Sequence, residues 1–119
     1  MAFEYLKTSF DMVKKLLEVL MENLGVKLVD SKIDSLIGKK TVNMNFYPIC
    51  PNPELTVGVG RHSDIGTLTV LLQDGIGGLY VNIPEDADIG KKGEWVEILP
   101  FSGALVINVG DMLHVQIKI

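Results

Sequence analysis

The fold is decided by a stretch that begins after Lys40 and that reads, over residues 41–83, TVNMNFYPICPNPELTVGVGRHSDIGTLTVLLQDGIGGLYVNI. Short runs of β-branched and aromatic residues alternate there with Pro, Gly and Asn, and the same texture continues downstream. So many short runs favour a sandwich or barrel over a parallel α/β sheet. The runs predict strands, in chain order, at 41–47, 57–64, 68–72, 79–83, 94–98, 104–109 and 112–117.

The sequence ahead of this stretch predicts a helix. Large apolar residues recur with three-and-four spacing from Phe3 to Leu24, without proline or internal glycine. Gly25 follows the last of them, and a left-handed helix end costs least at glycine, so we expect the helix to stop there. Ser31 is predicted to cap a second, short helical segment that Gly38 closes.

Length and composition indicate a single globular domain. The chain has 119 residues, of which 47% are hydrophobic and 22% are charged. We assign residues 1–40 to a helical scaffold and residues 41–119 to the strands. The predicted fold class is therefore mainly β with an N-terminal helix, an α+β arrangement.

Charge and cysteine content exclude several function classes. A net charge of −4 and a pI near 5.0 give no electrostatic footprint for nucleic acid or for an anionic membrane. No apolar run approaches the ~20 residues of a membrane span. The single cysteine, Cys50, can form neither an internal disulfide nor a cysteine-based zinc site, so we expect a cytoplasmic protein.

His62 and Asp64 form the only His-x-carboxylate pair on a predicted strand. The two-residue period of a strand sends both side chains to one face and sends Ser63 to the other. An imidazole and a carboxylate, joined by a second histidine from elsewhere, make the facial triad of non-haem Fe(II) oxygenases. By itself, the pattern fits equally well a surface histidine that happens to lie beside an acid.

Motifs on both sides of the His62–Asp64 pair favour a metal site over a chance surface pairing. They are, in chain order, Asn45-Phe46-Tyr47-Pro48, Cys50-Pro51, Pro53-Glu54-Leu55, Gly58, His62-Ser63-Asp64, Leu68-Thr69, Leu71-Leu72-Gln73-Asp74, Gly77-Gly78-Leu79, Val81, Trp95, Pro100, Gly103-Ala104-Leu105-Val106-Ile107-Asn108 and Gly110-Asp111. In this order they closely resemble the core of plant-type Fe(II)/2-oxoglutarate-dependent dioxygenases. The resemblance covers about Asn45 to Leu113, and Phe3–Val26 looks like the helix that precedes this core.

The resemblance implies an incomplete double-stranded β-helix, or jelly-roll, core and an iron site. His62 and Asp64 match the proximal Fe(II) ligands, whereas Asn45 and Tyr47 match positions that contact the co-substrate 2-oxoglutarate. Family members oxidise small molecules, commonly aromatic specialised metabolites, while 2-oxoglutarate is decarboxylated to succinate with ascorbate in support. The protein holds the ligands, excludes water and orients the substrate, and the metal carries out the oxidation.

The sequence also departs from the family pattern. Members continue past the Gly-Asp turn to a distal iron-binding histidine and to an arginine that grips 2-oxoglutarate, and this sequence reaches Ile119 before either. Only two histidines and one arginine are present. Arg61 adjoins His62 and is expected on the opposite face of the strand. His114 lies on a predicted strand, where it is either a substitute ligand or an edge residue.

These departures leave three functional hypotheses. The first is a partial dioxygenase of the family. The second is an inactive jelly-roll fragment that binds metal feebly or associates with itself or other chains, because an open sheet leaves its edge strands unpaired. The third is a binding module that works without metal, which the ordered motifs disfavour.

Overall fold

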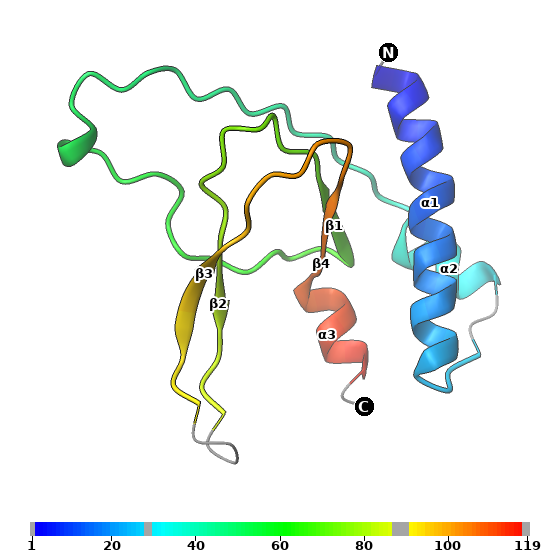
Figure 1. The fold of residues 1–119 in the computed structure, drawn as a ribbon. Helices are drawn as coiled ribbons and strands as arrows, with labels where there is room; N and C mark the ends of the chain where they lie inside the picture. Colours follow the sequence, from blue (N-terminus) through cyan, green and yellow to red (C-terminus); the bar gives the residue numbers. More distant parts are fainter. Residues whose placement is uncertain (1, 28–29, 87–90, 118–119) are drawn as a thin grey trace. The chain divides into compact units, whose positions relative to one another are not determined.

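The computed structural model describes residues 2–27, 30–86 and 91–117 (Figure 1). The chain divides into two compact units, one made of Met1–Thr67 with Gly110–Ile119 and the other of Leu68–Val109. The first unit contains helices α1 (Ala2–Asn23), α2 (Asp30–Leu36) and α3 (Asp111–Ile117) and the 3-10 turn η1 (Pro53–Leu55), and the second contains strands β1 (Leu68–Leu71), β2 (Tyr80–Ile83), β3 (Glu94–Glu97) and β4 (Val106–Val109).

Helix α1 and its end at Gly25 confirm the prediction from apolar spacing. Gly25 has a φ of 71°, its N–H donates to the Glu22 carbonyl at 3.0 Å, and the Val26 N–H donates to the Met21 carbonyl at 2.9 Å. This pair of bonds is a Schellman motif, which satisfies the last carbonyls of the helix. None of the helices in the described part of the chain has the length and hydropathy to cross a membrane.

The second helix also forms, but its predicted start is wrong. Helix α2 already includes Asp30, so Ser31 lies within the helix and is not its N-cap. The far end agrees with the prediction, because the Ile37 N–H donates to the Ile33 carbonyl and Gly38 follows. The first unit buries a small apolar core whose members are Leu17, Met21, Ile33, Ile37 and Leu113.

In its described residues, the second unit contains two separate antiparallel strand pairs. Strand β1 pairs with β4, with Leu68 opposite Val109, and β2 pairs with β3, with Tyr80 opposite Glu97. All four strands fall within predicted ones. The described residues therefore mix helices and antiparallel strands, as the α+β class requires. The expectation of a mainly β chain is wrong for them, because the helices contain more of these residues than the strands do.

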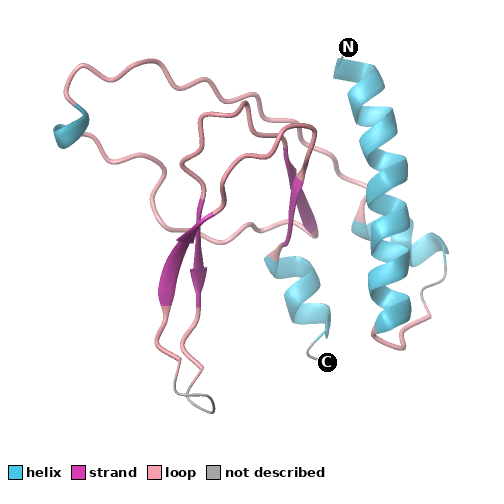
Figure 2. Cartoon of the chain, viewed as in Figure 1, coloured by secondary structure: helices cyan, strands magenta, loops and turns pink. Residues whose placement is uncertain are grey.

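Three predicted strands, all within the described residues, do not form. Residues 41–47 and 57–64 both lie in the long loop between α2 and β1, in which η1 is the one regular turn (Figure 2). The side chains of 41–47 are all exposed, and a β-type run without a ladder partner and without burial does not form a strand.

Residues 112–117 are a helix instead of a strand, because tertiary contacts override local preference. The first N–H groups of α3, which a helix leaves unpaired, find carbonyl acceptors at Asp64 and Gly66. Asp111 places a negative charge in the first helical turn, and Leu113 is only 1% exposed. A strand would lose these bonds.

The packing of the apolar core can be tested at Leu17. Leu17 is fully buried, so Leu17→Ala should remove its packing, leave a cavity and lower the free energy of unfolding by about 2–5 kcal/mol. Val19 lies on the same helix but is 42% exposed, and Val19→Ala is the matched control. Urea unfolding followed by circular dichroism measures both; equal losses would contradict the described packing.

Candidate metal site

The structure brings His62 and Asp64 together. His62 Nε2 lies 3.6 Å from Asp64 Oδ1, and the Ser63 hydroxyl donates at 2.8 Å to a different partner, Asp111 Oδ2. The segment is a loop and not the predicted strand, yet His62 and Asp64 lie close to each other while Ser63 bonds elsewhere. Both side chains of the pair remain accessible to solvent, with 59% exposure for His62 and 30% for Asp64.

A backbone contact sets the tautomer of His62. Its Nδ1 lies 2.8 Å from the Gly60 carbonyl oxygen, which can only accept a hydrogen bond. The contact is a hydrogen bond only if Nδ1 carries a proton, and Nε2 is then the ring nitrogen that lies nearest the Asp64 carboxylate. A metal-binding histidine is commonly oriented in this way by a carbonyl behind its ring.

The loop that carries the pair is held by the start of α3. The Asp111 N–H donates to the Asp64 carbonyl at 2.7 Å and the Met112 N–H to the Gly66 carbonyl at 3.3 Å. The Gly110 N–H donates to the Thr67 carbonyl at 2.9 Å. These bonds hold the backbone of Asp64 and of the residues after it against the segment that begins at Gly110.

Gly110 makes this approach sterically feasible. A Cβ built on Gly110 would lie 2.0 Å from the Gly66 oxygen and 2.9 Å from the Asp64 oxygen. Real Cβ atoms do not approach backbone atoms so closely. Only glycine therefore fits at this position without moving the loop.

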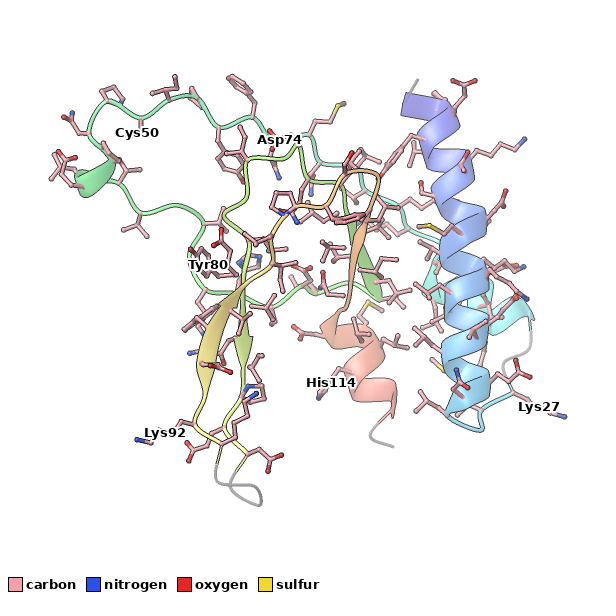
Figure 3. The ribbon with its side chains drawn as sticks, viewed as in Figure 1. Lys27, Cys50, Asp74, Tyr80, Lys92 and His114 are labelled. Atoms are coloured by element: carbon pink, nitrogen blue, oxygen red, sulfur yellow. The ribbon has the colours of Figure 1, made fainter. Side chains whose placement is uncertain are left out.

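The donor set suits a first-row divalent metal ion. Such ions bond imidazole nitrogen and carboxylate oxygen at about 2.0–2.2 Å, so one ion can contact two atoms 3.6 Å apart. Within residues 2–27, 30–86 and 91–117, however, no three His, Cys, Asp or Glu side chains cluster as metal ligands. His114 projects from α3 (Figure 3) and is exposed, and it does not complete such a cluster.

The two predicted co-substrate residues lie on the loop between α2 and η1. The side chains of Asn45 and Tyr47 are exposed, Tyr47 by 70%. Their contact with 2-oxoglutarate stays a prediction.

Sequence reasoning missed the supporting residues of the site. Ser63 was expected only to point away from the pair, and Gly110-Asp111 figured only as a motif in the resemblance. The partners Ser63 and Asp111 are 48 residues apart in the sequence. A short-range pattern carries no signal for such a contact.

An oriented imidazole and a carboxylate on one anchored loop define a candidate mononuclear metal site. Comparison with known proteins identifies the class: residues 39–116 match the model of the 2OG-Fe(II) oxygenase superfamily, and the chain belongs to this family.

Plant hydroxylases are among the curated relatives. The chain is 60% identical over 114 residues to scopoletin 8-hydroxylase of Arabidopsis thaliana and 53% identical over 115 residues to a feruloyl CoA ortho-hydroxylase of Ipomoea batatas. Each alignment covers 96% of this chain and 30% of the relative, so the chain spans about a third of the length of these proteins. No solved structure matches the chain.

The close approach of Gly110 to the backbone of Asp64 and Gly66 can be tested by adding a methyl group at Gly110. Gly110→Ala should push the Asp64–Gly66 loop away from α3 and lower the free energy of unfolding by about 1–3 kcal/mol, because the added methyl group overpacks the contact. Hydrogen exchange at the Asp111 amide should accelerate as well. The matched control is Gly58→Ala, since a Cβ at Gly58 meets nothing within 4 Å. Unchanged exchange in Gly110→Ala would refute the contact.

Proposed function

We propose that His62 and Asp64 are two protein ligands of the Fe(II) site of a 2-oxoglutarate-dependent hydroxylase. The observation that carries this proposal is the pairing of His62 Nε2 with Asp64 Oδ1 at 3.6 Å, with the imidazole oriented by Gly60. Membership of the 2OG-Fe(II) oxygenase superfamily supports the identity of the metal and the co-substrate. Fe(II) would supply the oxidative chemistry, coupled to conversion of 2-oxoglutarate to succinate.

The residues of this chain would hold the metal ion and orient the groups that bind it. His62 presents one nitrogen because Gly60 retains the proton on the other, and Asp64 contributes a negative charge that favours a cation. Asn45 and Tyr47 would contact 2-oxoglutarate. We propose, further, that residues 1–119 form part of one such domain, that residues 41–119 contribute to a jelly-roll core, and that the protein acts in the cytoplasm.

The relatives suggest the substrate class. They are named as hydroxylases of scopoletin and of feruloyl CoA, both small molecules with an aromatic ring. We infer a small aromatic metabolite as the substrate of the whole enzyme. Hydroxylation is the corresponding reaction.

A second candidate function is a non-catalytic chain that binds metal weakly or associates through its sheets. The lack of a three-ligand cluster among the described residues favours it. So do the large apolar side chains that the described chain leaves exposed, among them Phe46 at 87%, Ile49 at 98% and Phe101 at 80%. Exposed apolar surface and two-stranded sheets with open edges favour self-association.

Metal binding tests the proposed ligands. In anaerobic Fe(II) titrations, His62→Ala and Asp64→Ala should each weaken binding at least about tenfold, because each removes one of two protein ligands. His114→Ala is the matched control and should bind as the unmodified chain does. Equal affinities in all four proteins would contradict the assignment of the pair.

Turnover separates the two candidate functions. The chain is incubated with Fe(II), ascorbate and labelled 2-oxoglutarate, and succinate is measured. Succinate release that His62→Ala and Asp64→Ala abolish would show that the chain is catalytic. Metal binding without succinate release would support the non-catalytic function.

A further inference from the structure

We propose that Ser63 and Asp111 are positioning residues for the His62–Asp64 pair, an inference that rests on the proposed metal site. Neither side chain belongs to the pair itself. Their hydrogen bond, 2.8 Å from Ser63 Oγ to Asp111 Oδ2, ties the middle residue of the pair's own tripeptide to α3. The chemistry of this bond suits the role, because a hydroxyl that donates to a carboxylate forms a strong, charge-assisted hydrogen bond.

The bond acts on both proposed ligands because Ser63 lies between them in the sequence. Its side chain is bonded to α3, so the backbone that carries both His62 and Asp64 is restrained at its midpoint. The Asp111 N–H holds the Asp64 carbonyl at 2.7 Å. Asp111 therefore holds this tripeptide twice, through its carboxylate at Ser63 and through its amide at Asp64.

Without the side-chain bond, the tripeptide would lose one of its two attachments to Asp111 and keep the backbone bond at Asp64. The pair is accessible to solvent, and no strand ladder restrains residues 57–64. The His62 ring and the Asp64 carboxylate would then sample wider separations. Metal affinity should fall without loss of the fold.

Co(II) titration of the 119-residue chain, used as the probe for Fe(II), tests this role. Ser63→Ala and Asp111→Ala should each weaken Co(II) binding about tenfold, the lower end of the range for residues that support metal ligands. The double variant should bind no more weakly than the weaker single variant, because both changes remove the same bond. Ser63→Thr and Asp111→Asn keep a donor and an acceptor, and should restore most of the affinity.

The matched control is Ser35→Ala. Ser35 is exposed and donates to the Lys32 carbonyl at 2.9 Å, away from the pair. The proposal is overturned if Ser63→Ala binds Co(II) as tightly as Ser35→Ala, or if the losses of the two single variants add. Should Asp111→Ala fail to fold, the comparison of Ser63→Ala with Ser63→Thr decides alone.

A metal-free measurement separates failure of this inference from failure of the proposed function. If Co(II) binding does not depend on His62, the proposed metal site is wrong. The ¹⁵N resonances of the His62 ring, recorded without metal, then decide the positioning role. They should shift in Asp111→Ala and return in Asp111→Asn, and identical resonances in Asp111→Ala and the unmodified chain would overturn the inference.

Discussion

The hydrogen bonds that join the start of α3 to the loop after His62 are the constraint on which the candidate site depends. Backbone N–H groups from Gly110 onward donate to carbonyls between Asp64 and Thr67. A helix start leaves such donors unpaired, and a loop leaves such acceptors unpaired, so each satisfies the other. Gly110 permits the contact because it lacks a side chain. The His62–Asp64 pair thereby lies on a segment that is held in place although it has no strand ladder of its own.

The sequence predicted those elements whose stability is local. Helix α1 follows from apolar spacing and from Gly25, and its end is a hydrogen-bonded cap that one glycine decides. The four strands formed where a partner run was available for pairing. Residues 41–47 share the same β-type composition but are exposed without a partner, and composition alone could not distinguish the two cases.

Only the part of the candidate site that depends on neighbouring residues could be predicted from the sequence. His62 and Asp64 are two residues apart, and their side chains lie close together in the loop as they would on a strand. The helix at Asp111–Ile117 depends on backbone bonds to the distant segment that begins at Asp64, and the Ser63 hydroxyl donates to an Asp111 carboxylate 48 residues away. A strand was therefore the wrong prediction there. The family motif marked Gly110 and Asp111 but did not say what they touch.

X-ray absorption at the iron edge of the Fe(II)-loaded chain shows whether His62 holds the metal ion proposed for the His62–Asp64 pair. The multiple scattering of an imidazole ring is distinctive and reports how many histidines bind the metal. One imidazole is expected in the unmodified chain and in His114→Ala, and none in His62→Ala. An unchanged imidazole signal in His62→Ala, or no such signal in the unmodified chain, would show that His62 is not a ligand.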